Sequence, residues 1–438
     1  MTDVIAIFDI GKTNKKIFLF DKNLTIVYED IISFDEITDD DGFPCDDIEA
    51  IENWIDSKID TIQKEGNYRV KAINFTTHGA TVVYLDENGK RITPLYNYLK
   101  PLEDIDFTEF YNKYGGVNEF SRKTASPAYG MLNAGLQIYW LKNKKPQYWE
   151  NVRSILHYPQ YLSYLFSKKI TADFTSIGAH TATWDFDKME YHYWLEKEGI
   201  SLPEPEKGDE VVFINEGDER IAIGSGLHDS SSSLIPLLQE YTGSEFILLS
   251  TGTWILSMNP FSKEKLTQSQ LEQNCLCFLT PEKQQVKSSM QFLGHVHEVN
   301  EKKISEFFNE KESRFFTMEL NKELCEKVID RSEKIFFPNG IPQDFMADLQ
   351  QINRFKNYKQ AYAQLMYEIS RLVFEGIELI LDKDHNLKDI YISGGFSKNE
   401  YFRYYLGQLL PEVQVKISKI SNESALGAAL LMKKYLIE

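Results

Sequence analysis

The chain has 438 residues and a formal net charge of −18, with 66 acidic against 48 basic residues. This length predicts two domains with large cores, and the acidic balance argues against a general nucleic-acid binder. No stretch approaches the ~18 uninterrupted apolar residues of a membrane span. The N-terminus lacks the basic region and apolar core of a signal peptide. We therefore expect a cytoplasmic protein without nucleic-acid or membrane partners, and the four cysteines fit a reducing compartment.

Two apolar strands, predicted over 4–8 and 17–20, flank a polar turn from Asp9 to Lys15. The turn adds a carboxylate, a hydroxyl and several cations to the glycine that a hairpin needs. Backbone amides at such a turn, with lysines beside them, suit a bound phosphate. A surface hairpin with a soluble tip explains the same residues, so both interpretations stay open on this stretch alone.

The rest of the first half alternates strands and helices. A third strand is predicted over 24–34 and an amphipathic helix from Ile48, followed by a strand over 70–77 that ends at His78-Gly79-Ala80. Ligands gather at the carboxyl ends of strands in open α/β sheets, which makes this tripeptide a candidate site. A second hairpin over 82–89 and helices over 131–141 and 158–166 follow.

A short strand from Ile221 breaks into a glycine-containing loop that leads to Asp229, and the serines that follow open a helix. An ordinary helix cap is the alternative explanation for Asp229. The opening pattern then returns over 246–258 as strand, glycine-containing turn and strand. This repetition predicts two similar domains, 1–236 and 237–438, that face each other.

The second half carries predicted helices over 290–308, 316–331 and 358–381, and Cys275 and Cys277 alternate on a strand. His295 and His297 have a poor spacing for a metal on a helix, so we expect a surface or cleft role for them. A strand over 387–393 ends in Gly394-Gly395, where a nucleotide's sugar and base can lie against the backbone, although a tight turn also explains two glycines. A strand over 413–417 and a small-residue helix over 424–432 end the chain.

Together these segments resemble the FGGY family of carbohydrate kinases over nearly the whole chain. The resemblance rests on motifs that are weak alone and strong in this order: Phe8-Asp-Ile-Gly-Lys-Thr-Asn14, Leu136–Pro146, Asp173 with Trp184-Asp185, Gly226-Leu-His-Asp229, Ser250-Thr-Gly-Thr-Trp254, Ser393–Asn399 and Glu423–Ala429. Within the family, Gly226–Asp229 and Ser250–Trp254 look most like rhamnulose and fuculose kinases. The chain departs from the family at Thr77–Ala80, Tyr96–Lys100 and Phe292–Glu298, which leaves the sugar undetermined.

The resemblance implies an α/β fold of two ribonuclease H-like domains around a central cleft, as in actin-like ATPases. It implies transfer of the γ-phosphoryl group of ATP, with Mg²⁺, to a hydroxyl of a ketose like L-rhamnulose or L-fuculose. It assigns Asp229 as the base and Asp9 as the residue that organises the metal. The remaining implied residues contact the sugar (His78, Gly79, Ala80, His228), the phosphates (Gly11, Thr13, Asn14, Lys15, Gly252, Thr253) and the adenosine (Gly394, Gly395, Asn399).

The alternative from another class is an actin-like ATPase that acts as a switch, a filament or a sugar sensor without phosphorylating sugar. No helix-turn-helix pattern or basic tail supports a DNA-bound regulator. Dependence of ATP consumption on added sugar would separate the two hypotheses. Both hypotheses allow a homodimer.

Overall fold

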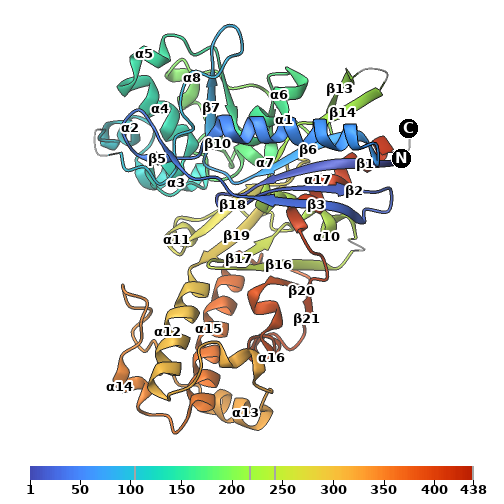
Figure 1. The fold of residues 1–438 in the computed structure, drawn as a ribbon. Helices are drawn as coiled ribbons and strands as arrows, with labels where there is room; N and C mark the ends of the chain where they lie inside the picture. Colours follow the sequence, from blue (N-terminus) through green and yellow to red (C-terminus); the bar gives the residue numbers. More distant parts are fainter. Residues whose placement is uncertain (103–104, 217–218, 241–242, 437–438) are drawn as a thin grey trace.

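The structure is a computed structural model that describes residues 1–102, 105–216, 219–240 and 243–436. Two sheets lie at the centre of the chain, one above the other in Figure 1. No helix among the described residues is long and apolar enough to cross a bilayer. All four cysteines are buried and unpaired.

The first sheet has seven strands and contains the opening hairpin. Its order is β13 (Val211–Glu216), β14 (Glu219–Gly224), β6 (Tyr68–Thr77), β1 (Thr2–Ile10), β2 (Lys15–Phe20) and β3 (Ile26–Ile32), with β15 (Leu227–His228) paired beside β6. β1 runs parallel to β6 and antiparallel to β2. The β-branched and aromatic residues of β1 and β2 are almost all fully buried, which explains why both strands are predictable from the sequence.

The second sheet repeats this arrangement with six strands. Its order is β18 (Cys275–Leu279), β19 (Gln285–Gln291), β17 (Ile255–Asn259), β16 (Glu245–Thr251), β20 (Leu387–Gly394) and β21 (Gln414–Ile417). The strand directions along β19-β17-β16-β20-β21 match those along β3-β2-β1-β6-β14. The predicted repetition of the first hairpin therefore extends to a whole sheet.

Helices cover both faces of the first sheet. One face packs on α1 (Ile48–Glu65) and α6 (Tyr158–Ser167). The other face packs on α17 (Glu423–Met432), the small-residue helix near the chain's end. Figure 1 shows α17 in red beside the blue strands β1 and β2. The last helix of the chain thus completes the core around its first strand.

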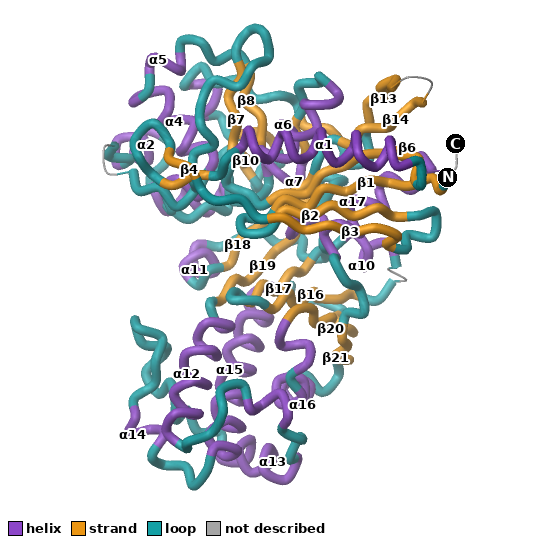
Figure 2. Tube along the Cα trace, viewed as in Figure 1, coloured by secondary structure: helices purple, strands orange, loops and turns teal. Residues whose placement is uncertain are grey.

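The second sheet packs against a group of long helices, which form the lower part of Figure 2. These are α12 (Leu293–Phe307), α13 (Lys322–Arg331), α15 (Tyr358–Ile380) and α16 (Glu400–Leu409). A separate lobe beside the first sheet has its own aromatic core, and consists of α2 (Thr108–Lys113), α3 (Val117–Thr124), α4 (Ala134–Lys144), α5 (Pro146–Trp149) and α8 (Trp194–Lys197).

Short elements connect these parts. The short strands are β4 (Ile37–Thr38), β5 (Pro44–Cys45), β7 (Val82–Leu85), β8 (Ser154–His157), β9 (Ala172–Asp173), β10 (Trp184–Asp185), β11 (Glu190–Tyr191) and β12 (Pro205–Glu206). The short helices are α7 (Phe174–Ile177), α9 (Asp229–Ser232), α10 (Ile235–Gln239), α11 (Gln268–Glu272) and α14 (Leu349–Ile352), with 3₁₀ turns at Gly130–Leu132, Arg314–Thr317, Gly395–Lys398 and Lys433–Leu436.

Four element predictions need correction. The helix predicted over 131–141 is a 3₁₀ turn at Gly130–Leu132 followed by α4, which runs from Ala134 to Lys144. The helix predicted from Met290 begins at Leu293, because Met290 is still paired with Leu256 in the sheet. The helix predicted from Phe316 begins at Lys322, where the Asn321 side chain caps it. The chain turns back after the strand at 82–85 as predicted, and Leu85 forms a bridge with Arg91. The main partner of this strand is however β8, which lies far along the chain.

Candidate active site

Asp9 lies at the centre of the first sheet, at the carboxyl end of β1. Its neighbours across the sheet are Lys16 on β2 and Thr76 on β6. The Thr76 hydroxyl donates a 2.8 Å hydrogen bond to the Asp9 carboxylate. Burial raises the pKa of Asp9, and the negative charge of Asp229 raises it further. Asp9 and Asp229, which are far apart in sequence, are therefore neighbours in space.

Asp229 is the first residue of α9, immediately after β15. His228, not Asp229, occupies the cap position of α9, so the cap explanation for Asp229 is wrong. The Ser230 amide donates to the Asp229 carboxylate, whose side chain is still 36% exposed. Burial raises the pKa of Asp229, while the nearby His78 lowers it in part. An accessible carboxylate with a raised pKa suits a general base.

A chain of buried hydrogen bonds holds His228 beside Asp229. The His228 amide donates to the Thr175 hydroxyl (2.8 Å), which itself donates to the Asp173 carboxylate (2.6 Å). Asp173 caps α7, and burial raises its pKa to about 6. The sequence marks Asp173 only as part of a motif, and the structure shows that it positions the segment before the candidate base.

A cavity of about 800 Å³, here called the acceptor cavity, lies in front of Asp229. Both halves of the chain contribute to its wall: His78, Gly79, Ala80, Tyr98, Leu99, Pro127, Tyr129, Leu132, His180, Asp229 and Ser230 from the first, and Trp254, Asn274, Leu276 and Met290 from the second. The structure thus brings the predicted sugar residues 78–80 to Asp229. The other lining residues, which include Tyr98, His180 and Trp254, are not among the predicted site residues.

His228 is buried directly behind Gly79, where a Cβ would approach its Nε2 to 2.7 Å. His228 itself does not line the acceptor cavity among the described residues. Burial lowers its pKa to about 4, so its ring is neutral at neutral pH.

A second cavity of about 270 Å³, here called the donor cavity, lies against the second sheet. Four predicted nucleotide residues line it: Gly252, Thr253, Gly395 and Asn399. His297, Phe315 and Phe396 supply an apolar and aromatic wall that suits a purine base. His297 therefore has the predicted cleft position, with its Nε2 3.1 Å from the Tyr362 hydroxyl.

Gly394 shapes the backbone beside the donor cavity. It has φ +77°, and a Cβ there would lie 2.0 Å from the Thr251 carbonyl, so only glycine fits. Asn399 caps α16 and also donates to the Tyr362 hydroxyl (2.7 Å). A tight turn and a helix cap therefore account for part of this motif, and its contact with adenosine stays a prediction.

The β16–β17 turn separates the two cavities. Gly252 and Thr253 line the donor cavity, and the next residue, Trp254, lines the acceptor cavity.

The tip of the first hairpin is divided between exposed and buried residues. Thr13 and Asn14 are exposed, and the Gly11 amide closes the turn on the Asn14 carbonyl. Lys15 is 1% exposed and lies 3.1 Å from Asp46, which also binds Lys12. The Lys15 ammonium thus already has an ion-pair partner, and its contact with phosphate stays a prediction.

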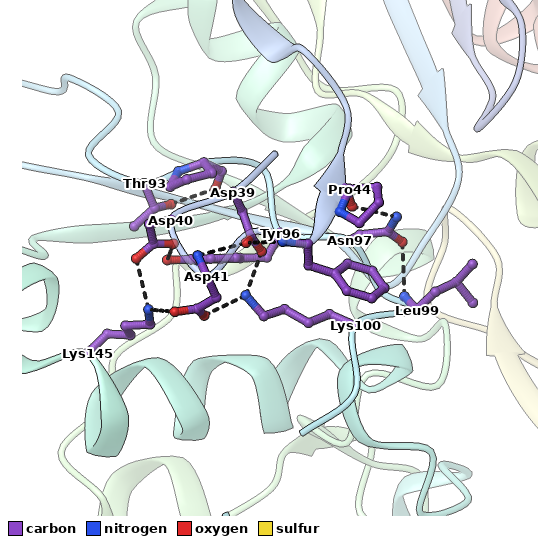
Figure 3. Close-up of polar contacts among 12 residues, drawn as sticks. Asp39, Asp40, Asp41, Pro44, Thr93, Tyr96, Asn97, Leu99, Lys100 and Lys145 are labelled. Atoms are coloured by element: carbon purple, nitrogen blue, oxygen red, sulfur yellow. Dashed lines mark hydrogen bonds and ion pairs between the residues drawn. The ribbon is translucent and has the colours of Figure 1, made fainter. Parts of the chain in front are cut away.

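Three successive acids, Asp39 to Asp41, converge near the lobe (Figure 3). Two lysines neutralise them: Lys100 lies 2.5 Å from Asp39 and 2.6 Å from Asp41, and Lys145 lies 2.9 Å from Asp40. Ammonium groups occupy the positions that a metal would take, so this cluster is structural. It anchors Lys100 at the end of the loop that carries Tyr98 and Leu99 to the acceptor cavity.

The chemistry of the site fits a nucleotide with Mg²⁺. Asp9 and Asp229 offer oxygen ligands, which Mg²⁺ prefers, and their mutual repulsion favours a cation nearby. Outside the Asp39–Asp41 cluster, no three such ligands converge among the described residues. This sparse set fits an ion that keeps most of its waters.

The fold and the two cavities agree with what comparison with known proteins finds. The N-terminal domain of the FGGY family of carbohydrate kinases matches residues 4–201, and the FGGY carbohydrate kinase C-terminal domain matches residues 243–437. The chain belongs to the FGGY family of carbohydrate kinases. This FGGY protein is accordingly an ATP-dependent carbohydrate kinase with a small-molecule sugar as substrate, and the ATPase-switch alternative is not favoured.

Individual relatives are distant. Rhamnulokinase of Oceanobacillus iheyensis is 23% identical over 448 aligned positions, which cover 96% of this chain and 90% of that protein. Rhamnulokinase of Halalkalibacterium halodurans is 24% identical, over 57% of this chain and 54% of that protein.

Solved structures confirm the predicted fold. A carbohydrate kinase from Novosphingobium aromaticivorans has a TM-score of 0.81 at 20% identity, covering 98% of this chain and 91% of that one. A ligand-bound xylulose kinase from Lactobacillus acidophilus has a TM-score of 0.76 at 16% identity, covering 99% and 89%. The FGGY chain therefore has the two-domain fold of actin-like ATPases.

Proposed function

We propose that this kinase transfers the γ-phosphoryl group of ATP to a hydroxyl of a ketose of the L-rhamnulose or L-fuculose type, with Asp229 as general base. The observation that carries the proposal is the shared wall between the two cavities. Asp229 faces the acceptor cavity, which the β16–β17 turn separates from the donor cavity. The two rhamnulokinase relatives support the choice of sugar.

Phosphoryl transfer depends on positioning, on charge neutralisation and on a group that accepts the alcohol proton. Asp229 accepts that proton, since its carboxylate is accessible from the acceptor cavity. His78, Gly79 and Ala80 contact the sugar at the end of β6, with His228 packed behind them.

The nucleotide lies between the two hairpins. Its phosphates meet Gly11, Thr13, Asn14 and Lys15 on the first hairpin, and Gly252 and Thr253 on the second. Gly394, Gly395 and Asn399 hold the adenosine. Asp9 orients Mg²⁺ through water, and the bound ion neutralises phosphate charge.

The proposed domains, 1–236 and 237–438, close on the two substrates, while α17 stays packed on the first sheet. Closure would bring Trp254 and Met290 toward Asp229 and exclude water, which otherwise competes as phosphoryl acceptor. The segment 229–236 is the proposed hinge.

A coupled assay with L-rhamnulose, L-fuculose, D-xylulose, D-gluconate and glycerol tests the proposal. We expect ATP consumption that depends on added sugar and is fastest with one of the two deoxyketoses. Faster turnover of another acceptor would reject the proposed sugar. Sugar-independent hydrolysis with polymerisation would instead support an actin-like ATPase switch.

A further inference from the structure

His180 stands out because its backbone is held in an unfavourable conformation at the wall of the acceptor cavity. Its φ is +43°, and Ala182 two residues later has φ +61°, both in the left-handed region that side chains rarely adopt. Such strain persists only where the surroundings enforce it, and it is common at functional sites.

Buried hydrogen bonds to the lobe enforce this conformation. The Asn133 amide side chain donates to the His180 carbonyl (2.8 Å), and the Gly135 amide donates to the Thr181 carbonyl (2.7 Å). The Ala182 amide donates to the Ser126 hydroxyl (2.9 Å). All these partners come from residues 126–135, so the start of α4 fixes where the imidazole of His180 lies.

The hydrogen bond of the ring determines which nitrogen carries the proton. His180 Nδ1 lies 3.1 Å from the Leu132 carbonyl, which can only accept, so Nδ1 is the donor. Burial lowers the pKa of His180 to about 4, so the ring is neutral at neutral pH. Nε2 then carries a lone pair, and no hydrogen bond joins it to another of the described residues.

His78, which also lines the acceptor cavity, has a similar arrangement. Its Nδ1 lies 3.0 Å from the Gly79 carbonyl, and its Nε2 is buried without a partner in the described chain. His78 Nε2 is itself closed off from the cavity, so the acceptor cavity offers the His180 lone pair and the Asp229 carboxylate, both of which accept hydrogen bonds. A ligand with several hydroxyl groups supplies the matching donors.

We propose that His180 is a specificity-determining residue whose Nε2 accepts a hydrogen bond from a sugar hydroxyl other than the one that is phosphorylated. This assignment rests on the proposed function, because it takes the acceptor cavity as the sugar site. His180 acts there on binding and orientation of the sugar, while Asp229 acts on the transferred hydroxyl.

The test compares His180→Phe, which keeps a ring but removes both nitrogens, with His180→Asn, which keeps an oxygen acceptor and tolerates the left-handed backbone. We expect His180→Phe to weaken sugar binding and kcat/KM for the sugar about tenfold, with KM for ATP unchanged. His180→Asn should recover part of the loss. His192→Phe is the matched control, because His192 is also buried with a pKa near 4 but lies outside the acceptor cavity.

Deoxy analogues of the preferred sugar, each lacking one hydroxyl, identify the contact. In wild-type protein one analogue should lose about tenfold in affinity, and in His180→Phe that analogue and the parent sugar should bind almost equally. A merely structural role would lower the affinity for all analogues alike, and that result would overturn the inference.

Calorimetric titration of the same five acceptors separates this inference from the proposed function. Binding that depends on His180, in a protein that phosphorylates none of them, would reject the kinase proposal and support the role of His180. Equal binding by wild type and His180→Phe, or no binding of any acceptor, would overturn the inference.

Discussion

Two of the histidines near Asp229 are neutral at neutral pH, and this affects how strong a base its carboxylate is. Burial lowers the pKa of His228 and of His180 to about 4, so neither ring is charged at neutral pH. The carboxylate of Asp9 lies close enough that the charge of Asp229 raises the pKa of Asp9. A carboxylate in such surroundings is a stronger base than an exposed aspartate, because desolvation disfavours its charged form.

Asp229→Asn should lower kcat for the sugar by about 10² or more, because the amide cannot accept the proton. Nucleotide affinity should stay nearly unchanged, since the donor cavity lies beyond the β16–β17 turn. Steady-state kinetics and titration with ATP measure the two effects. Wild-type turnover in this variant would show that another group is the base.

Among single residues, the sequence predicts those site residues that stand at the ends of strands. It does not predict site residues whose role is set by contacts with distant parts of the chain. Asp9, His78 and Asp229 follow apolar strands, so local pattern identifies them. His180 follows a short helix, and its role depends on a bond to Leu132, 48 residues away. Lys15 looks like a phosphate ligand in the sequence, but folding places Asp46 beside it.

Among the elements, the loop from Tyr96 to Lys100 shows how a wall of the acceptor cavity is fixed. Lys100 forms an ion pair with the buried Asp39. The Asn97 side chain donates a hydrogen bond to the Pro44 carbonyl and accepts one from the Leu99 amide. Figure 3 shows these contacts of Asn97 and Lys100. Tyr98 and Leu99, which lie between them, line the cavity on a loop that is held at both ends.

Lys100→Met should destabilise the protein by about 3–5 kcal/mol, because it removes the cation that pairs with the buried Asp39 charge. The KM for the sugar should rise as Tyr98 loses its fixed position. Lys113→Met is the control, since its ion pair with Glu198 leaves the lysine 55% exposed and should contribute little to stability. Denaturant unfolding that gives equal values for both variants would contradict this account.

The contact between α17 and α9 is the second element-level feature. Gly427 of α17 lies so close to α9 that a Cβ would be 2.0 Å from the Ser232 carbonyl. The Ser232 hydroxyl also donates to the Ser424 carbonyl (2.7 Å). Since α9 begins at Asp229, the last helix supports the candidate base.

Gly427→Ala should push α9 and α17 apart, cost about 1–3 kcal/mol of stability and lower kcat for the sugar. Gly407→Ala in α16 is the matched control, because no atom lies within 4 Å of its new methyl group. That control should gain about 0.5–1 kcal/mol from helix propensity and leave kcat unchanged. Unaltered kcat in Gly427→Ala would mean that α17 does not support Asp229.

At the scale of the whole molecule, five histidines are buried in neutral form. Burial lowers the pKa of each from 6.5 to about 4, and they are His157, His180, His192, His228 and His297. Between these two pKa values the unfolded chain binds more protons than the folded one. Their contribution to stability is therefore complete above pH 6.5 and is lost as pH falls toward 4.

The histidines should therefore lower the free energy of unfolding between pH 7 and pH 5, by about 1 kcal/mol or more for each, and Asp173 should offset part of this loss, because burial raises its pKa to about 6 and it takes up a proton in the folded state. Urea titrations across this range measure the slope. His297→Phe should reduce this pH dependence by the contribution of one histidine, because burial alone shifts the pKa of His297. A free energy of unfolding that stays constant across the range would contradict this prediction.

The sequence predicts the global arrangement better than the element boundaries. Apolar strands around a polar turn occur twice, and this repetition predicts two similar sheets. The true start of α12 could not be predicted, because Met290 suits a helix and a strand equally and only pairing with Leu256 decides between them. The partner of β7 is likewise set by tertiary contacts rather than by its turn.

The position of α17 also constrains how the chain folds during synthesis. Ile5, Ile7, Phe18 and Phe20 form the face that α17 covers, and they leave the ribosome long before residues 423–432. We expect one apolar face of the first sheet to stay uncovered until residues 423–432 have been synthesised. The amino-terminal half should therefore depend on the carboxyl-terminal end of the chain, or on a chaperone in the interval, to avoid aggregation.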